Sequence, residues 1–273
     1  MGLDGKLEIV GLTDVGRKRS HNEDTIGTDE DLGVVVLADG MGGYKAGEVA
    51  SAIAVNLILE ETREGLQDVR PGGIDEESGY SQESLVIKAA IEKANETIFQ
   101  TAQSQPQCQG MGTTVVAAAF YDNRLTVAHV GDSRLYRSRE GRLEQVTTDH
   151  SLLQELIDKG FYTPEEAKRS LNKNLVTRAM GIEMGVSPDV QEDVVIAGDV
   201  YLLCSDGLSD LVDDDEIQAI LDSHIESLDE AARQLVQCAN DKGGKDNISV
   251  ILARSLKPFA AKKSWYSRVF DWF

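Results

Sequence analysis

Cysteine is scarce in this chain, and so are other features that would cross-link or anchor it. The 273 residues include 3 cysteines, Cys108, Cys204 and Cys238, without a CxxC spacing. An odd number of scattered cysteines indicates free thiols in a reducing compartment such as the cytoplasm, and argues against a disulfide framework or a zinc site. Residues 4–8 are polar, and we recognise no secretory leader. No apolar run approaches the ~20 residues that a membrane-spanning helix needs.

Positive charge is also scarce. The 27 Lys and Arg residues stand against 47 Asp and Glu residues, which gives a formal net charge of −20. Such a surface repels nucleic acids and anionic membranes, so we expect no nucleic-acid partner for the body of the protein. The share of hydrophobic residues, 41%, is ordinary for a globular protein that buries a sizeable core. If the acids converge in that fold, they would bind cations.

The predicted elements do not alternate regularly between strand and helix. Apolar spacing predicts four helices, over 46–65, 81–103, 213–223 and 228–241. Strand patterns occupy 7–13, 33–38, 112–120, 124–131, 133–139, 142–148 and 247–254, and two more flank 197–199. Either Ser81 or Ser84 would cap the second helix. We therefore expect an α+β fold in which mostly antiparallel sheets are covered by helical pairs, and not a doubly wound parallel sheet.

One domain is expected over residues 1–255, because no linker separates two cores. Residues 151–186 are mostly polar and read as an inserted flap. Residues 256–273 form a tail that is basic and aromatic, in contrast to the acidic body. Three interpretations of this tail stay open: contact with a membrane surface, docking to a partner, and a disordered end.

Four aspartates occupy junctions between strands and turns. Asp39 follows "VVVLA", Asp132 follows "LTVAHVG", Asp206 follows "VYLLCS", and Asp246 directly precedes the last strand. A single Asp-Gly pair is usually an ordinary turn, and that alternative applies to each of these positions taken alone. Four such junctions suggest instead that the carboxylates meet, where a cation must compensate their charge. Oxygen-only ligands favour Mg²⁺ or Mn²⁺ over zinc.

With these pieces assembled, the chain resembles the metal-dependent serine/threonine protein phosphatases of type 2C, in their compact bacterial form. The resemblance runs from about Leu7 to Arg254. Eight segments carry it: "GRKRSHNED" (16–24), "VVLADGMGG" (35–43), "GEVAS" (47–51), "MGTT" (111–114), "AHVGDSRLY" (128–136), "TTDHSLL" (147–153), "LLCSDGLSD" (202–210) and "GGKDNISVI" (243–251). Each segment alone is weakly specific, whereas all eight in this order are very specific.

The resemblance implies a fold, an activity and a set of ligands. The fold is a central sandwich of two antiparallel sheets with a helical pair on each outer face. The activity is hydrolysis of phosphoserine and phosphothreonine in proteins, opposing a Ser/Thr kinase, by water activated between two Mn²⁺ or Mg²⁺ ions. Asp39 would bridge the ions, the Gly40 carbonyl would bind one of them, and Asp206 and Asp246 would hold the other.

Further roles follow from the same resemblance. Glu23 and Asp24 would act through metal-bound water, and Asp132 would share a weaker third ion with Asp206. Arg19 would grip the substrate phosphate, because a planar guanidinium can bind two phosphoryl oxygens. The alternative for Arg19 is a solvated arginine in a basic loop.

The general acid is left unassigned. Eukaryotic relatives place a histidine directly after the Asp-Gly pair, where this chain has Met41. Many bacterial relatives have a histidine where this chain has Tyr44. A metal-bound water, or Tyr44, would then protonate the leaving oxygen. We interpret His129 as a packed core histidine, and expect His150 to organise the start of the flap.

Two other functions compete with this hypothesis. An aspartyl-phosphate phosphatase or receiver domain also places an aspartate after a strand, but within parallel βα units. A phosphatase-like sensor or scaffold, catalytically weak, would show gaps among the metal-binding positions. Phospho-enzyme trapping would support the first alternative, and missing carboxylates would support the second.

Overall fold

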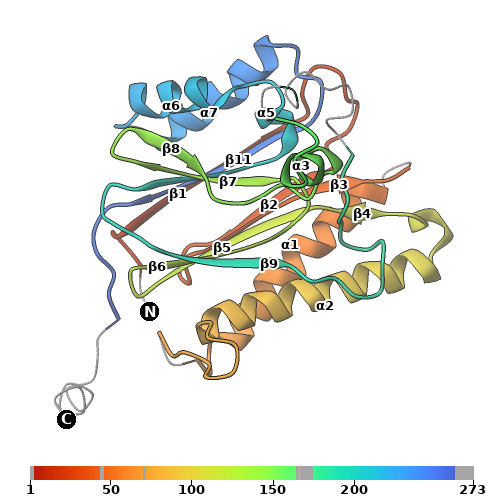
Figure 1. Cartoon of the computed structure of the whole chain (residues 1–273), viewed down its shortest axis with the longest axis horizontal. Coiled ribbons are helices and arrows are strands. Elements are labelled where there is room, and N and C mark those ends of the chain that lie inside the picture. Colours follow the sequence, from red (N-terminus) through yellow and green to blue (C-terminus); the bar gives the residue numbers. More distant parts are fainter. Residues whose placement is uncertain (1–2, 44–45, 70–71, 164–165, 167–174, 262–273) are drawn as a thin grey trace.

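The computed structural model describes residues 3–43, 46–69, 72–163, 166 and 175–261 (Figure 1). Its strands form two sheets in which all paired strands are antiparallel. The first sheet has the order β1 (Leu7–Asp14), β11 (Ile248–Ser255), β10 (Val200–Cys204), β7 (Arg134–Arg139) and β8 (Arg142–Gln145). The second has the order β2 (Asp24–Asp29), β3 (Val34–Met41), β5 (Val115–Tyr121), β6 (Arg124–Val130) and β9 (Asp189–Val194), and β4 (Gly112–Thr113) pairs with β3.

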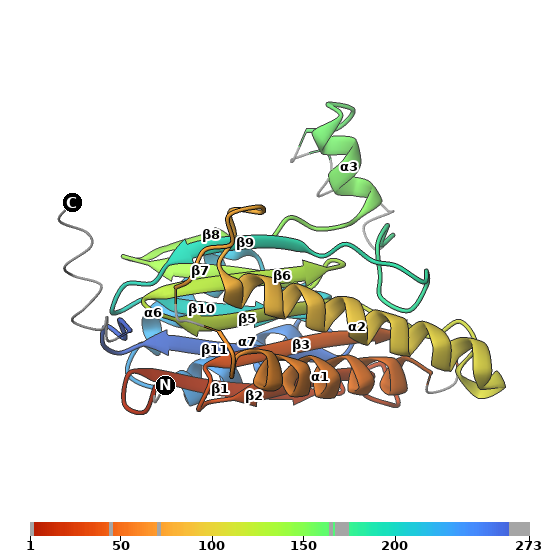
Figure 2. The same ribbon diagram turned by 90° about the horizontal axis from the view of Figure 1, so that it is seen from below.

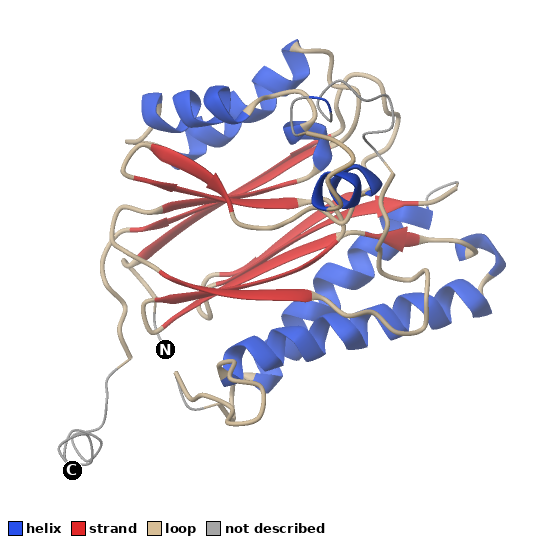
Figure 3. Ribbon diagram, viewed as in Figure 1, coloured by secondary structure: helices blue, strands red, loops and turns tan. Residues whose placement is uncertain are grey.

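Helices cover both outer faces of the sheet pair. Figure 3 shows the four layers, with α1 (Ala46–Gly65) and α2 (Gln82–Ser104) on the second sheet and α6 (Asp214–Ser223) and α7 (Leu228–Asp241) on the first. Three shorter helices complete the described set: η1 (Pro106–Cys108), α3 (Leu152–Asp158) and α5 (Asp206–Ser209). The predicted α+β class, with antiparallel sheets between helical pairs, is confirmed.

The continuous apolar run of β3 reflects burial on both faces of the strand. Val34 and Val36 pack in the layer between the second sheet and α1 and α2. Val35 and Leu37 point the other way, into the layer between the two sheets. Successive side chains of a strand alternate between its faces, so a strand covered on both sides needs apolar residues throughout. The run leads directly to Asp39 and thereby places this residue at the end of a rigid strand.

Side-chain caps define where the helices begin. Ser81, and not Ser84, caps α2, because its hydroxyl accepts a 3.1 Å hydrogen bond from the Ser84 backbone N–H. Asp213 and Glu216 form a reciprocal capping box at the start of α6. Capping satisfies backbone donors that the first turn of a helix leaves free.

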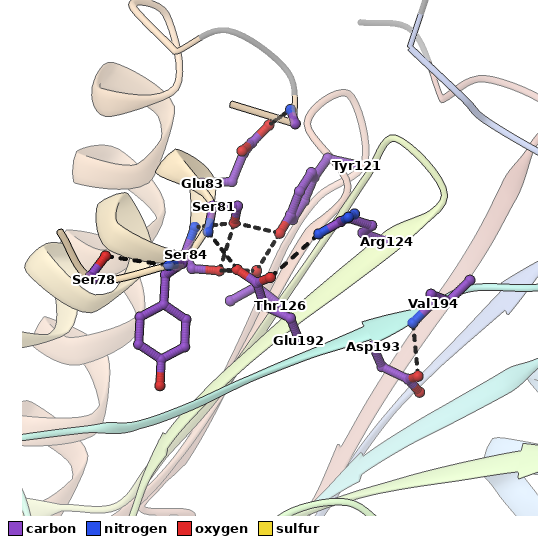
Figure 4. Close-up of polar contacts among 12 residues, drawn as sticks. Ser78, Ser81, Glu83, Ser84, Tyr121, Arg124, Thr126, Glu192, Asp193 and Val194 are labelled. Carbon is purple, nitrogen blue, oxygen red and sulfur yellow. Dashed lines mark hydrogen bonds and ion pairs between the residues drawn. The ribbon is translucent and has the colours of Figure 1, made fainter. Parts of the chain in front are cut away.

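A buried polar cluster ties the start of α2 to the second sheet (Figure 4). Glu192 of β9 accepts hydrogen bonds from the Ser81 backbone at 2.7 Å and the Ser84 hydroxyl at 2.6 Å. Tyr121 contacts the Ser81 hydroxyl at 2.7 Å and Thr126 at 2.8 Å. These bonds satisfy polar atoms that would otherwise be costly to bury, and they fix the start of α2 on the second sheet.

The region predicted as a flap leaves and rejoins the sandwich at neighbouring points. Ser151 and Val176 form an isolated bridge, and the intervening α3 stands away from the two sheets (Figure 2). Beyond this bridge the chain packs again, since Met180 is fully buried and the Gly181 N–H donates to Asn95 of α2. Residues 164–165 and 167–174 of the predicted flap lie outside the described residues.

The described part of the predicted tail remains in contact with the core. Phe259 is 3% exposed and lies in the layer between the sheets. The backbone N–H groups of Phe259 and Ala261 donate to Asn123 and Asp122, in the turn between β5 and β6. Residues 262–273 lie outside the described residues. Among the helices that the structure does describe, none combines the length and apolarity required to cross a bilayer.

Candidate active site

Five aspartates from both sheets meet at one end of the sandwich. Asp39 lies near the end of β3 and is paired in register with Asp24, the first residue of β2. Asp206 begins α5 directly after β10, Asp246 precedes β11, and Asp132 lies in the turn after β6. Sequence patterns placed Asp24 in a loop and missed β2, because "DTIGTD" contains one large apolar residue and sits at a sheet edge.

The charges of these carboxylates act on one another. Asp39 is half-buried in this cluster, and the loss of contact with water raises its pKa well above the ordinary value. The neighbouring charges of Asp24, Asp206, Asp132 and Asp246 raise this pKa further. Buried like charges that face each other disfavour ionisation of the whole group. The ionisation of each of these carboxyl groups therefore depends on the charge of the others.

Asp206 and Asp132 show the same effect. Burial raises the pKa of Asp206 to about 8, and Asp132 and Asp246 add to the shift. Burial also raises the pKa of Asp132 to about 6, with a further contribution from Asp149. Asp210, which sequence reasoning had not singled out, raises the pKa of both Asp206 and Asp132. Its position four residues after Asp206 on a helical turn was the available signal.

Asp24 is held by two hydroxyl groups. Its Oδ2 atom accepts hydrogen bonds from Ser205 at 2.9 Å and from Ser249 at 2.6 Å. Burial raises the Asp24 pKa to about 6, and these hydroxyls oppose the shift. Neither serine had been singled out from the sequence, although both lie in the segments that carry the resemblance. They join β2 of one sheet to β10 and β11 of the other.

Two buried oxygen atoms in this centre have no partner among the residues that the structure describes. They are Asp24 Oδ1 and Asp206 Oδ1. Burying an unpaired carboxylate oxygen is costly, and a hard cation is the partner such atoms accept best. The donor set consists of oxygen atoms, so the residues present fit Mg²⁺ or Mn²⁺. Within the described ranges, the group that brings three ligand atoms within 4.8 Å of one another is His129, His150 and Asp189.

Gly40 permits close approach of three backbone segments. Its N–H donates to the Glu23 carbonyl at 3.1 Å. A Cβ atom at Gly40 would lie 2.2 Å from the carbonyl oxygen of Gly47 and 2.5 Å from that of Glu23. Only glycine fits there, which explains the glycine near the end of β3, and the close contact is with Gly47 in the first turn of α1. The predicted role of the Gly40 carbonyl as a ligand stays a prediction.

Arg19 lies against the carboxylate centre. Its Nη2 atom is 2.6 Å from Asp246 Oδ2, and its side chain is 52% exposed. This hydrogen bond is the main cause that raises the Arg19 pKa. Burial raises the pKa of Glu23, and Arg19 opposes that shift. A half-exposed guanidinium beside a cation site can receive a phosphate from solvent.

Asn247 organises the loop that carries Arg19, and sequence reasoning missed it. Its Nδ2 donates to the Val15 and His21 carbonyls at 3.0 and 2.9 Å, and its Oδ1 accepts from the Glu23 N–H at 2.8 Å. The side chain is 4% exposed. The signal was its place directly after Asp246, where a buried side-chain amide can form hydrogen bonds with the backbone of a neighbouring loop.

The two histidines behave as predicted from the sequence. His129 is 1% exposed and its Nε2 lies 2.8 Å from the Thr148 carbonyl, which confirms a packed and hydrogen-bonded histidine. Its ring stacks on His150 with centroids 4.6 Å apart. His150 directly precedes the bridge that closes the flap.

Of the two positions at which relatives carry a histidine, Met41 is the last residue of β3, and Tyr44 lies outside the described residues.

Fold and centre together define a four-layer sandwich protein whose two antiparallel sheets enclose a carboxylate centre at one end. A family model described as protein phosphatase 2C matches residues 15–252. The chain belongs to the protein phosphatase 2C family.

Named relatives agree with this assignment. The chain is 40% identical over 250 residues to the serine/threonine protein phosphatase PstP of Mycobacterium tuberculosis, and covers 45% of that protein's length. It is 39% identical over 243 residues to the serine/threonine phosphatase stp of Listeria welshimeri, which it covers to 92%. These alignments take in 90% and 88% of this chain.

A solved structure agrees in fold. The catalytic domain of PstP, solved in complex with 2 manganese ions, superposes with a TM-score of 0.78 at 38% identity. The superposition covers 92% of this chain and 99% of that structure. The sandwich inferred from the sequence is thus the fold of a solved member of the family.

Proposed function

We propose that this chain hydrolyses phosphoserine and phosphothreonine in proteins, opposing a Ser/Thr kinase. The observation that carries the proposal is the convergence of five buried or half-buried aspartates on one centre beside an exposed arginine. Anionic phosphate would be repelled by bare carboxylates, so the centre needs cations before it can accept the substrate. Relatives named serine/threonine phosphatases support the same activity.

Two Mn²⁺ or Mg²⁺ ions would be held by Asp39, the Gly40 carbonyl, Asp206 and Asp246. Glu23 and Asp24 would act through bound water, and Asp132 would share a third ion with Asp206. When bound, the two metal ions would supply the positive charge that activates water and stabilises the phosphoryl oxygens. The unpaired oxygens of Asp24 and Asp206 support this assignment, as does the manganese complex of the PstP catalytic domain.

The protein groups divide the remaining work. Ser205 and Ser249 orient Asp24 through its Oδ2 atom, and Oδ1 has no hydrogen-bond partner among the described residues. Arg19 would release its hydrogen bond to Asp246 and donate to two phosphoryl oxygens of the substrate. These bonds would orient the substrate for in-line attack. The general acid stays unassigned.

The competing functions gain no support. An aspartyl-phosphate phosphatase or receiver domain requires parallel βα units, whereas the described strands pair antiparallel. A degenerate sensor or scaffold would lack metal-binding positions, whereas each of the acids in question is present.

Further parts of the proposal concern organisation and location. Residues 1–255 would form the catalytic domain with a flap at 151–186, in a reducing compartment such as the cytoplasm. The three free cysteines support that compartment. The basic aromatic tail 256–273 would contact a membrane surface or a partner. Because Phe259 is buried, deletion of residues 262–273 is the variant to compare with the full chain in liposome co-sedimentation.

Phosphopeptide hydrolysis tests the activity directly. Purified protein should release phosphate from phosphoserine and phosphothreonine peptides with Mn²⁺ and lose this activity in EDTA. Asp39→Asn keeps the shape of the side chain and removes its charge, so activity should fall by at least ~100-fold, as for loss of a transition-state charge contact. Asp68→Asn, in an exposed turn after α1, is the matched control. Full activity in EDTA or in Asp39→Asn would overturn the proposal.

A further inference from the structure

A second cluster of ionisable residues lies next to the aspartate centre but outside the proposed ligands. His129 of β6 and Asp189 of β9 are direct partners in the strand register. His150 stacks on His129, and its Nε2 atom lies 3.3 Å from Asp189 Oδ2. The composition of two histidines and one carboxylate resembles a transition-metal site.

The hydrogen-bond partners argue against a metal in this cluster. The Gly131 N–H donates to His150 Nδ1 at 3.0 Å, so Nδ1 carries the lone pair and the neutral ring carries its proton on Nε2. The Nε2 atom of His129 faces the Thr148 carbonyl, which only accepts, and must therefore be protonated too. The His150 nitrogen that faces Asp189 thus has no lone pair for a metal. This N–H group lies close to Asp189 Oδ2 but without the geometry of a hydrogen bond, so Nε2 has no hydrogen-bond partner among the described residues.

His150 and Gly131 are joined twice. Besides the bond to the ring, the His150 backbone N–H donates to the Gly131 carbonyl at 2.9 Å. Gly131 has a φ of +109°, and a Cβ there would lie 2.6 Å from the Thr114 side chain. Only glycine can therefore adopt this backbone conformation. The next residue is Asp132. The ring nitrogen of His150 thus fixes the backbone from which Asp132 projects.

The same loop is bonded to Asp39 on its other side. The Ser133 hydroxyl lies 2.7 Å from Thr114 Oγ1, and this oxygen accepts from the Asp39 N–H at 3.2 Å. Asp132 is therefore flanked by two anchors, His150 on one side and the Thr114 contact on the other. Both anchors are buried, which makes their geometry well defined.

Residues at the C-terminal end of the flap contact His150 and its neighbour Asp189. Asp189 Oδ1 accepts a 2.8 Å hydrogen bond from Arg178. The Thr177 N–H donates to the His150 carbonyl at 2.8 Å. Both residues follow directly after Val176, where the flap rejoins the sandwich. A chain of contacts therefore runs from the flap through His150 to the Asp132 loop.

We propose that His150 is a positioning residue that sets the Gly131–Asp132 backbone for the third cation and links it, through Asp189 and Arg178, to the flap. This inference rests on the proposed function, because it assumes that Asp132 binds a cation. Residues that orient a metal ligand without touching the metal typically change affinity by ~10–100-fold when replaced. The ion pair between Asp189 and Arg178 is half exposed, so its contribution should be smaller than that of His150.

Two substitutions of His150 distinguish its hydrogen bond to Gly131 from its contact with Asp189. His150→Asn places a carbonyl oxygen where Nδ1 lies and can still accept from Gly131. His150→Gln places its amide near the Nε2 position and keeps a polar group beside Asp189, but loses the bond to Gly131. Mn²⁺ titration by calorimetry should show a weakest binding step that is reduced ~10-fold or more in His150→Gln and close to wild type in His150→Asn. Melting in EDTA measures the purely structural cost of each change.

Asp132→Asn distinguishes the outcomes. If Asp132→Asn binds Mn²⁺ like wild type, the assignment of Asp132 in the proposed function fails. If Asp132→Asn loses the weakest Mn²⁺-binding step while His150→Gln retains it, the role of His150 is overturned. The same conclusion follows if His150→Asn binds Mn²⁺ in this step as weakly as His150→Gln. Long-range proton–nitrogen NMR of the metal-free wild-type protein gives a test that needs no variant. It should show His150 protonated at Nε2, and a proton at Nδ1 would refute the proposal.

Discussion

Arg19 donates a 2.6 Å hydrogen bond to Asp246, which lies 227 residues further along the chain. The bond joins the proposed phosphate-binding group to a proposed metal ligand. A phosphate dianion would compete with Asp246 for Arg19, and a cation would compete with Arg19 for Asp246. Binding of the cation should therefore release the arginine for the substrate.

Substitution of Arg19 should affect substrate binding more than metal binding. A charge-assisted hydrogen bond contributes ~1.5–3 kcal/mol, so Arg19→Gln should raise KM for a phosphopeptide by about ten-fold or more. Arg19→Lys keeps the charge but not the planar fork, and should recover part of the loss. Steady-state kinetics together with Mn²⁺ calorimetry would test this. An unchanged KM in Arg19→Gln would show that Arg19 does not contact the phosphate.

The metal-free protein should lose stability as the pH rises from about 6.5 to 8.5. Burial raises the pKa of Asp206 to about 8 and that of Asp39 well above its ordinary value. A carboxyl group whose pKa is higher in the folded state binds protons more tightly when folded, so raising the pH towards that pKa favours unfolding. The buried His150, with a pKa lowered to about 4, has the opposite effect at lower pH, so the carboxylates dominate above ~6.5, the ordinary pKa of histidine.

Urea unfolding in EDTA across this pH range measures the effect. One pKa unit corresponds to ~1.4 kcal/mol, so a decline on the order of 1–3 kcal/mol is expected. Excess Mn²⁺ should abolish the decline, because it replaces the protons as the compensating charge. Asp206→Asn should flatten the metal-free curve. A metal-free curve that is flat or rises over this window would contradict the raised pKa values.

Gly40→Ala should destabilise the protein even without metal. Its Cβ would meet backbone oxygens of Gly47 and Glu23 at 2.2 and 2.5 Å, and backbone cannot rotate away as a side chain can. Overpacking of this kind costs ~1–3 kcal/mol or more. Gly43→Ala, three residues further along the chain, is the control, since a Cβ there meets nothing within 4 Å. Equal unfolding free energies of the two variants in EDTA would refute the close-packing argument.

Asn247→Ala should both destabilise the fold and weaken substrate binding. It removes three hydrogen bonds from a buried side chain, a loss of ~2–4 kcal/mol at ~0.5–1.5 kcal/mol each. The loop between Val15 and Glu23 carries Arg19, so KM should rise together with the loss of stability. Asn56→Ala, on the exposed face of α1, should change the unfolding free energy by less than ~1 kcal/mol. An Asn247→Ala variant that matches this control in stability and KM would exclude the role.

Much of the fold was predictable because burial leaves a periodic record in the sequence. The helices around Ile58, Ile91 and Leu235 were found from apolar spacing, and for the second of them the sequence offered Ser81 or Ser84 as the cap, of which Ser81 is the cap in the structure. The short edge strand β2 was missed, because it has too few apolar residues to show a period and is stabilised by the neighbouring strand. The strand predicted over 112–120 is two strands in the structure, β4 and β5.

The candidate centre was predictable in its acids but not in its supporting groups. Asp39, Asp132, Asp206 and Asp246 stood out because each follows or precedes an apolar strand. Asn247, Ser205 and Ser249 did not stand out, since polar residues of these types are common in turns. Their function depends on partners more than 180 residues away in the chain, such as Asp24 for both serines.

The sequence by itself determined which strands are buried on both faces, and hence where the rigid ends that carry Asp39 and Asp206 fall. It also determined that the proposed metal ligands offer oxygen atoms. Only the tertiary structure decided that these ends meet, that Arg19 pairs with Asp246, and that His150 bonds Gly131. Local residue patterns encode burial and turn chemistry. Distances between segments from different sheets arise from how the sheets pack, which no single stretch of sequence contains.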